Sequence, residues 1–162
     1  MTAITPCLWF DDRLEEAAEF YTAIFPNSSI GHLARYGEAG PGQPGTVMAG
    51  EFTLDGTTFR AINGGPMFAF SEAVSFSISC TGQAEVDYYW DSLVDGGEES
   101  MCGWLKDRFG LSWQIVPTRL HELLFDPDPA RATAAQQAML AMRRLVIADL
   151  EAAADAAVPT SH

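Results

Sequence analysis

The feature of this sequence that most limits its fold is a weak internal repeat, seen when the chain is shifted by 69 residues against itself. Four apolar residues at helix-face spacing then superpose on four others: Ala17, Phe20, Tyr21 and Ile24 on Val86, Tyr89, Trp90 and Leu93. An early apolar run superposes on a serine-rich one: Pro6, Leu8 and Phe10 on Ser75, Ser77 and Ser79. Because the order of the surrounding elements also matches, the sequence predicts two copies of one module.

Each half of the sequence predicts a strand, a helix and then further strands. The first half contains four predicted strands, at residues 4–10, 29–36, 46–54 and 57–63. Its predicted helix is capped by Asp11 or Asp12 and runs to about Phe25. Asp55-Gly56 predicts a hairpin turn, and the Gly- and Pro-rich residues 37–45 predict a mobile loop. The second half contains a helix at 83–94 and strands at 74–80, 104–107 and 111–116. It is shorter between its helix and final hairpin, so one strand there is reduced.

Two β-α-β-β-β modules of this kind predict an α+β fold with one curved mixed sheet, helices on its outer face and a cup on its inner face. Side chains alternate between the two faces of a strand, which assigns the residues. We expect packing beneath the helices for Cys7, Trp9, Phe76, Ile78 and Cys80. We expect the cup to be faced by Leu8, Phe10, Ser75, Ser77 and Ser79. Three serines in a row are unusual in a dry core and suit a face that meets water or ligand.

The end of the chain differs in composition. Pro127 and Pro129 mark a loop, and the Ala-rich residues 130–157 predict a helix. The apolar stripe of this helix contains Met139, Met142, Leu145, Val146 and Leu150. The stripe packs on the protein's own sheet or on a dimer partner, or binds another partner through its methionines. We therefore expect a two-module domain over residues 1–128, with modules at 3–66 and 73–118, and a helical extension over 129–158.

Charge and cysteine content narrow the partners and the compartment. The chain carries 22 acidic and 9 basic residues, a net charge of −13, which repels phosphate backbones and anionic lipid surfaces. We therefore expect no nucleic acid and no membrane as partner. No apolar run approaches the roughly 18 residues of a membrane span, and no secretory signal is visible. Cys7, Cys80 and Cys102 suit free thiols in a reducing cytoplasm better than a disulfide framework.

Four segments carry a family resemblance. They are EEAAEFYTAIFPNS, AINGGP, CGWLKDRFGLSWQIVP and, in the tail, AMLAMRRLVIADLEAA. These segments resemble the PhnB-like proteins, a group often labelled as the 3-demethylubiquinone-9 3-methyltransferase domain. That group is part of the glyoxalase/bleomycin-resistance/dioxygenase, or vicinal oxygen chelate, superfamily. The resemblance extends from about Ile4 to Ala154 and is most specific from Cys102 to Pro117. It implies the paired-module glyoxalase fold and a homodimer.

The resemblance does not extend to the metal site of the superfamily's metal-using members. Their His and Glu ligands fall here at Pro6, within residues 60–63, at Ser75 and at Gln114. These positions hold no imidazole or carboxylate, which divalent metals require. The three histidines, His32, His121 and His162, lie elsewhere. We therefore expect no catalytic metal and no cofactor.

The methyltransferase label also lacks support from the residues. A site for a methyl-donor nucleotide needs a Gly-rich turn between a strand and a helix. Gly64-Gly65-Pro66 follows a strand but precedes no helical pattern, so we regard the label as inherited.

The predicted binding site is the cup, closed by the loops at residues 37–45 and 66–70. Its candidate lining residues are Leu8, Phe10, Arg60, Asn63, Phe68, Phe70, Ser75, Ser77, Trp104 and Gln114. Two of them have competing interpretations. Gln114 either contacts a polar ligand or pairs with Ser75. Arg60 either anchors an anionic ligand or forms a surface ion pair.

Two further groups have both a chemical and a structural interpretation. Lys106 beside Asp107 is an acid–base pair if buried, whereas Asp107 alone is a cap for backbone amides in the turn that follows. Cys102 is a nucleophile if a base or cation lies close, and otherwise a buried inert thiol. We favour the structural interpretation for both.

Three functions remain open from the sequence. The first is a small-molecule binding protein, or a metal-independent enzyme, of the vicinal oxygen chelate fold. The second is a metal-dependent lyase or dioxygenase of the same superfamily. The third is a dimeric protein that sequesters cationic drugs, like the antibiotic-binding members of that superfamily, and the acidic charge keeps it open.

Overall fold

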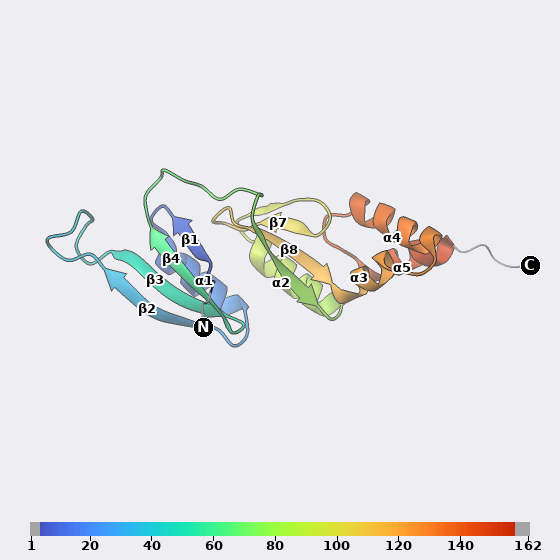
Figure 1. Cartoon of the computed structure of the whole chain (residues 1–162), viewed down its shortest axis with the longest axis horizontal. Helices are drawn as coiled ribbons and strands as arrows, with labels where there is room; N and C mark the ends of the chain where they lie inside the picture. The colour runs from blue at the N-terminus through green and yellow to red at the C-terminus, as the bar shows by residue number, and fades with distance from the viewer. Residues whose placement is uncertain (1–3, 158–162) are drawn as a thin grey trace, which may run out of the picture. The chain divides into compact units, whose positions relative to one another are not determined.

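The computed structural model describes residues 4–157. The chain divides into two compact units, with the boundary between Phe70 and Ser71. The expected boundaries at residues 3 and 158, and His162, lie outside the described residues. Each unit contains one of the expected modules, and each module forms its own four-stranded mixed sheet (Figure 1). The α+β class with paired β-α-β-β-β modules is therefore confirmed, with two sheets in place of one.

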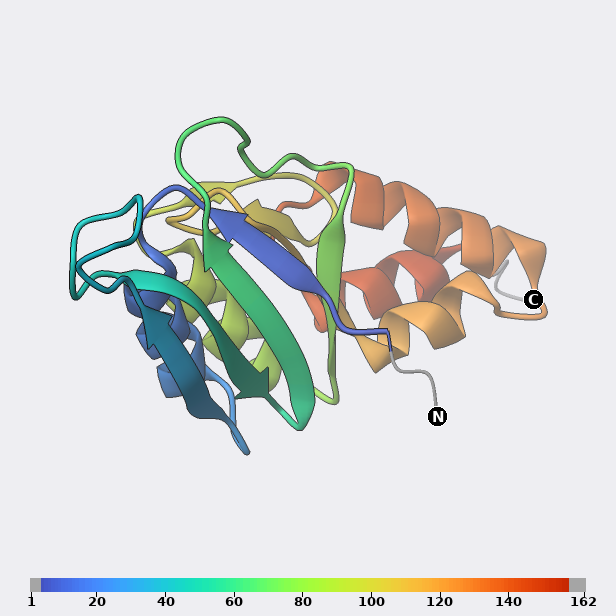
Figure 2. The same ribbon diagram turned by 60° about the vertical axis from the view of Figure 1, so that its left-hand side comes forward.

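The first unit contains four strands and one helix: β1 (Cys7–Phe10), α1 (Leu14–Ile24), β2 (Ser29–Arg35), β3 (Val47–Leu54) and β4 (Thr57–Asn63). The strand order is β1-β4-β3-β2, with β1 parallel to β4 and the other pairs antiparallel. Helix α1 lies against one face of this sheet (Figure 2). Its Tyr21 contacts Phe52 of β3, which stacks on Phe59 of β4 at a centroid distance of 5.6 Å. These rings form the core of the unit.

The second unit repeats this arrangement and adds three helices. Its module comprises β5 (Ser75–Cys80), α2 (Gln83–Val94), β6 (Glu98–Glu99), β7 (Trp104–Lys106) and β8 (Ser112–Pro117), in the strand order β5-β8-β7-β6. β6 has only two residues, which confirms the reduced strand. The fully buried Trp90 of α2 donates its indole N–H to Glu99 at 3.1 Å, so the helix is tied to this short strand.

The two modules differ by one residue in the connection between their first strand and helix. Asp11–Arg13 separate β1 from α1, whereas only Thr81 and Gly82 separate β5 from α2. Because successive side chains alternate between faces, one extra residue reverses which strand positions meet the helix. The shift of 69 residues therefore superposes equivalent positions of the two helices. In the preceding strands, it superposes residues that face the helix in one module on residues that face away from it in the other.

This difference corrects the face assignment of β1. Leu8 and Phe10 pair with Ala61 and Asn63, which alternate on β4 with the same parity as Phe59 of the helix-covered core. Leu8 and Phe10 are buried on that covered face, and Cys7 is exposed on the open one. The prediction that Cys7 and Trp9 pack beneath the helix and that Leu8 and Phe10 face the cup is wrong. In the second unit the assignment holds, since Phe76 packs with the buried Trp113 while Ser77 and Ser79 are exposed.

The N-terminus of α1 is capped from a distant strand rather than by the acidic residues before it. Arg13 occupies the N-cap position, and its side chain does not cap the backbone of the helix. Instead, the Leu14 N–H donates to Oδ1 of Asn63 at 3.0 Å, and the Asn63 amide donates to the Val47 carbonyl at 3.0 Å. Asn63 thereby joins helix α1 to β3 and β4, and the predicted cap at Asp11 or Asp12 is wrong.

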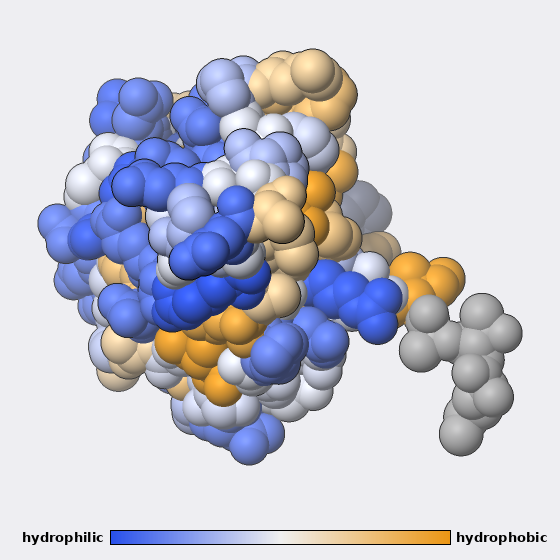
Figure 3. Space-filling model, turned by 90° about the vertical axis from the view of Figure 1, so that its left-hand side faces the viewer, coloured by the Kyte–Doolittle hydropathy of each residue, from blue (hydrophilic) through white to orange (hydrophobic). Residues whose placement is uncertain are grey.

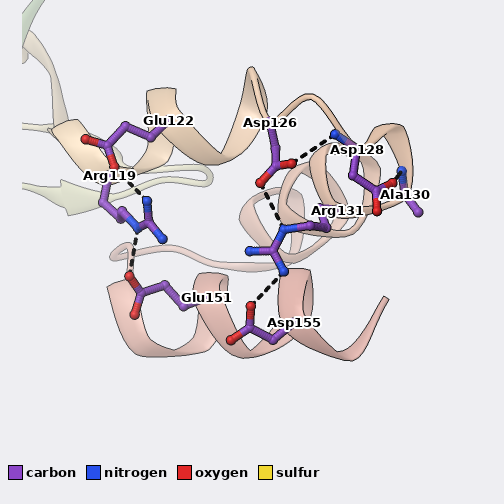
Figure 4. A network of polar contacts seen from close by, with 8 residues as sticks. All are labelled: Arg119, Glu122, Asp126, Asp128, Ala130, Arg131, Glu151 and Asp155. Atoms are coloured by element: carbon purple, nitrogen blue, oxygen red, sulfur yellow. Dashed lines mark hydrogen bonds and ion pairs between the residues drawn. The ribbon is translucent and has the colours of Figure 1, made fainter. Parts of the chain in front are cut away.

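The tail is three helices rather than one: α3 (Thr118–Leu124), α4 (Pro129–Ala141) and α5 (Ile147–Ala156). Their leucines and alanines form a separate core that includes Leu120, Leu123 and Leu150. Two arginines connect the helices (Figure 4): Arg131 pairs with Asp126 and Asp155, and Arg119 with Glu122 and Glu151. The helices thus pack within their own chain. Helix α3 gave no signal in the sequence analysis.

The predicted single helix over residues 130–157 is interrupted because residues 142–146 bind the module. The N–H groups of Cys102 and Gly103 donate to the carbonyls of Met142 and Arg143 at 2.7 and 2.8 Å. The Gln83 side chain donates to the Leu145 carbonyl at 3.1 Å and accepts from the Ile147 N–H at 2.8 Å. These bonds use backbone groups that a continuous helix would need for itself.

The side of the molecule drawn in Figure 3 is mostly hydrophilic. Hydrophobic residues gather there in smaller patches between the hydrophilic ones. Within residues 4–157, no helix combines the length and the apolar character needed to cross a membrane.

The cap provided by Asn63 gives a stability prediction. Asn63→Ala removes the acceptor of the Leu14 N–H and the donor to Val47, and we expect the free energy of unfolding to fall by about 2 kcal/mol. Asp12→Ala is the matched control, because Asp12 is exposed and does not provide the cap; its effect should stay within about 0.5 kcal/mol. Urea denaturation of both variants checks this. Equal effects would contradict the assignment of the cap.

The buried thiol of Cys80 gives a pH prediction. Burial raises the pKa of Cys80 from 9.0 to about 11, since the thiolate is disfavoured away from water. The unfolded chain therefore releases this proton at lower pH than the folded chain. The stabilising contribution is complete below pH 9 and is lost as the pH rises towards 11. We expect the free energy of unfolding to fall more steeply over this interval in the wild type than in Cys80→Ala. Parallel curves would contradict the prediction.

Candidate functional site

The open face of the first sheet carries a small groove with charged residues along it. The strand register places Cys7 beside Arg60 and Arg60 beside Glu51, across three adjacent strands. The groove has a volume of about 240 Å³, and its lining includes Cys7, His32, Ala49, Glu51, Arg60 and Ile62. No helix of this unit covers the face, because α1 packs on the opposite side. Of these residues, the sequence analysis identified only Arg60 as a site residue.

Arg60 differs from the other basic residues of the chain. The sequence contains 9 lysines and arginines. Eight of them form ion pairs: Arg13, Arg35, Lys106, Arg108, Arg119, Arg131, Arg143 and Arg144. Within residues 4–157, Arg60 forms no ion pair. The interpretation of Arg60 as half of a surface ion pair is therefore not supported, and the interpretation as an anion anchor remains.

The other predicted lining residues of the first unit lie away from this groove. Leu8, Phe10 and Asn63 lie on the helix-covered face, as described above. The rings of Phe68 and Trp9 pack in a T-shaped arrangement with their centroids 4.9 Å apart, and those of Phe70 and Phe10 do the same at 5.3 Å. The two phenylalanines therefore extend the aromatic packing at the end of β1.

The glycine turn after β4 is filled by a tryptophan. The Trp9 indole N–H donates to the Gly65 carbonyl at 2.9 Å, and a Cβ on Gly64 would lie 2.3 Å from the same ring. Gly65 has φ of +88°, which favours glycine. The turn is thus explained by packing against Trp9. No helix follows it within the unit, so it lacks the geometry of a nucleotide-phosphate turn.

A second, larger cavity of about 730 Å³ lies in the first unit between the start of α1 and the loop at residues 37–46. Its lining includes Asp11, Asp12, Glu15, Arg35 and Tyr36. The ion pair between Arg35 and Glu15, at 2.6 Å, and the hydrogen bond from Arg35 to the Gly45 carbonyl, at 3.1 Å, connect the helix to this loop. The sequence analysis did not predict an acidic cavity here, because it treated Asp11 and Asp12 as helix caps.

In the second unit, Ser75, Ser77, Trp104 and Gln114 share the open face of the sheet. The register pairs Ser77 and Trp104 with Gln114 on either side. The Gln114 amide donates to Oγ of Ser75 at 2.8 Å, so of the two interpretations of Gln114 the structure shows the pairing with Ser75. All four candidates of this unit therefore lie on one polar face.

Asp107 performs the structural role that the sequence analysis favoured. It is only 3% exposed, and its carboxylate accepts from the N–H groups of Phe109 and Leu111 and from the indole of Trp113. Lys106 points away and pairs with Glu72 at 2.5 Å. This contact raises the pKa of Lys106 and lowers that of Glu72, chiefly through the hydrogen bond between them. The two neighbours thus have separate partners.

Cys102 lies at the contact with the tail and is partly exposed rather than buried. Its φ of +60° is unusual for a residue with a side chain, and its N–H is bound by Met142. Lys106, the only nearby cation in the sequence, is engaged by Glu72. Arg143, whose carbonyl binds the Gly103 N–H, is paired with Glu99. Within residues 4–157, both of these cations are thus engaged by glutamates, which does not favour an activated thiol at Cys102.

The residues at the superfamily's metal positions do not fit a divalent metal. Pro6 has no donor, Arg60 is a cation, and Gln114 and Ser75 bind each other. Among residues 4–157, no three His, Cys, Asp or Glu side chains come together as potential ligands. These positions therefore do not provide the ligands that metal-dependent chemistry would need.

The fold and the site together define the class of protein. The paired modules with open sheet faces are the fold of the vicinal oxygen chelate superfamily. The chain belongs to the family described as 3-demethylubiquinone-9 3-methyltransferase, whose family model matches residues 2–116. The match ends before the tail, so the expected extension of the family to Ala154 stays a prediction. No curated protein matches the chain.

Solved structures support this placement. The PhnB protein of Bacillus cereus, described as a 3-demethylubiquinone-9 3-methyltransferase, is 36% identical with a TM-score of 0.67; the match covers 72% of this chain and 100% of that one. Protein PA1353 of Pseudomonas aeruginosa is 20% identical with a TM-score of 0.60, over 72% and 98%. The fosfomycin resistance protein FosX of Listeria monocytogenes is 15% identical with a TM-score of 0.52, over 75% and 97%. The last two show similarity of fold alone.

The hydrogen bonds of Asp107 give a test of its role. Asp107→Asn keeps the shape but replaces one acceptor oxygen by a donor, and we expect the free energy of unfolding to fall by about 2–4 kcal/mol. The control is Asp95→Asn, which removes an exposed carboxylate paired with Arg108 and should cost at most about 1 kcal/mol. Thermal and urea unfolding provide the measurement. Full stability of Asp107→Asn would reopen the acid–base interpretation.

Proposed function

We propose that this protein binds a small molecule on the open faces of its sheets, without a catalytic metal. The observation that carries the proposal is Arg60: it lies in the groove of the first sheet, and within the described residues it has no ion-pair partner. In a chain with 22 carboxylates, an arginine without such a partner is unusual, and its planar guanidinium suits a bidentate contact with a carboxylate or phosphate. The expected ligand therefore carries an anionic group.

The surroundings of Arg60 support a ligand rather than a purely structural role. The groove combines apolar strand residues, Ala49 and Ile62, with a few polar groups, which is the usual composition of a small-molecule site. His32 and Cys7 add an imidazole and an exposed thiol to the same groove. The groove is small, so it fits a compact ligand or one end of a longer ligand.

Transfer of a methyl group is not part of this proposal. The glycine turn that a nucleotide donor would need is filled by Trp9, as described above. A metal-dependent lyase or dioxygenase is also disfavoured, because the donor set at the expected positions does not suit a divalent metal.

Sequestration of a cationic drug is the second candidate, and a separate observation favours it. The 730 Å³ cavity of the first unit is lined by Asp11 and Asp12 together with the Glu15–Arg35 pair and the ring of Tyr36. A cavity with carboxylates and an aromatic ring suits an organic cation. This candidate predicts the opposite ligand charge from the Arg60 groove, so ligand charge discriminates between the two.

The remaining expectations are part of the proposal. We propose a homodimer in the cytoplasm, with a glyoxalase-like domain over residues 1–128 and a helical extension over 129–158. Light scattering on the purified protein measures the dimer, and limited proteolysis around the Asp126–Asp128 connection tests the boundary.

Arg60 provides the test of function. We expect small aromatic carboxylates or phosphates, supplied as a screening panel, to quench tryptophan fluorescence saturably, since Trp9 is half-buried on the open face of β1. Arg60→Ala should weaken this binding about tenfold or more. Arg13→Ala is the matched control, because Arg13 is an exposed arginine of the same unit at the N-cap of α1.

Three results would contradict the proposal. They are binding of no panel member, equal affinities in the Arg60→Ala and Arg13→Ala variants, and loss of binding when EDTA removes a stoichiometric metal. A matched set of aromatic amines tests the second candidate, and preference for these cations over the anions would favour sequestration instead.

A further inference from the structure

The open face of the second sheet contains a buried hydroxyl that has no hydrogen-bond partner. Ser112 is 1% exposed, and among the described residues its Oγ is the one buried side-chain polar atom left unpaired. An unsatisfied buried hydroxyl costs about 1–3 kcal/mol. The side chain lies on the open face, because Ser112 precedes the helix-facing Trp113 and pairs with Ser75 on one side and Lys106 on the other.

The neighbours of Ser112 are hydrogen-bond donors. The Ser75 hydroxyl accepts from Gln114, which leaves its own proton for another acceptor. Lys106 pairs with Ser112 across the β7–β8 ladder, where the Cβ atoms of paired residues lie about 5 Å apart. The register thus places two serines and a lysine at neighbouring positions on three adjacent strands, and none of the three is a carboxylate. Such a set suits an oxygen-rich anion.

A carboxylate already occupies part of this position. Glu72 pairs with the Lys106 ammonium at 2.5 Å, and its side chain is 61% exposed. Exposed ion pairs contribute about 0–1 kcal/mol, so Glu72 is easily displaced from Lys106 by a competing anion.

We propose that Ser112, Ser75 and Lys106 form an oxyanion subsite that binds a carboxylate or phosphate group of the ligand, with Glu72 holding Lys106 in its absence. The subsite rests on the proposed function, since it names the chemical group that this second sheet recognises. It is carried by a different observation from Arg60 and lies in the other unit. Trp104, on the same face, provides an aromatic surface beside it.

The test uses phenyl phosphate and benzoate as probes, with benzamide and benzylamine as neutral and cationic controls, and isothermal titration of the whole chain. We expect the two anions to bind and the controls to bind at least tenfold more weakly. Lys106→Gln should weaken anion binding about tenfold or more. Glu72→Gln should tighten it several-fold, because the ammonium no longer has a competing carboxylate.

Ser112→Ala separates a ligand-binding role from a structural one. Because the hydroxyl has no partner in the ligand-free protein, its removal should leave the melting temperature of the free protein unchanged or raised, while anion affinity falls several-fold. Ser79→Ala, an exposed serine further along the same face, is the matched control and should change neither. A lowered melting temperature with unchanged anion affinity would overturn the inference.

The remaining outcomes distinguish the subsite from the general proposal. If the anions bind and only Arg60→Ala weakens them, the subsite is wrong and the proposed function stands. If neutral or cationic probes bind and anions do not, the subsite is again overturned while small-molecule binding stands. If no probe binds, both are contradicted.

Discussion

The arrangement of both units depends on the parallel pairing of the first strand of each module with its last. β1 pairs with β4 and β5 with β8, and each pair needs a crossover connection, which α1 and α2 provide. The helix then covers one face of its sheet and leaves the other open. Since side chains alternate along each strand, the length of the strand–helix connection decides which residues enter the core and which meet a ligand. The residues on the open face of each sheet therefore depend on the crossover and on whether two or three residues connect the first strand to the helix.

That count also explains how far the sequence could predict the site. Helix α2 and strand β4 have the predicted bounds, because their periodicity and flanking turns are local signals. The two faces of β1 were assigned the wrong way round. Apolar residues occupy successive positions there, so the pattern did not show which residues face the helix, and the repeat then led to the wrong assignment. The cap from Asn63 and the break at residues 142–146 arise from contacts between segments 40 to 64 positions apart. No local pattern encodes such contacts.

The most specific family segment, Cys102 to Pro117, is now explained by the fold. Cys102 and Gly103 bind the tail carbonyls, Asp107 holds the turn and Trp113, and Gly110 adopts a φ of +84° after it. Each of these roles positions backbone and needs no substrate. These roles identify the family without transferring an activity. Of the residues proposed to bind a ligand, Arg60 and Ser75 lie outside this segment, and Lys106 and Ser112 lie within it on either side of the turn.

The acidic net charge of the protein is compatible with an anionic ligand, because charges act on a ligand only over a short distance in salt solution. A nucleic acid or a lipid surface meets many charges of the protein at once, so a net charge of −13 disfavours it. A small ligand meets only groups within a Debye length, about 8 Å at physiological salt. Eight of the nine basic residues are already paired with carboxylates, which makes the local surroundings of Arg60 and of the serine-lined face more decisive than the total charge. The same composition that disfavours large polyanions is therefore compatible with a small anion held by a few hydrogen-bond donors.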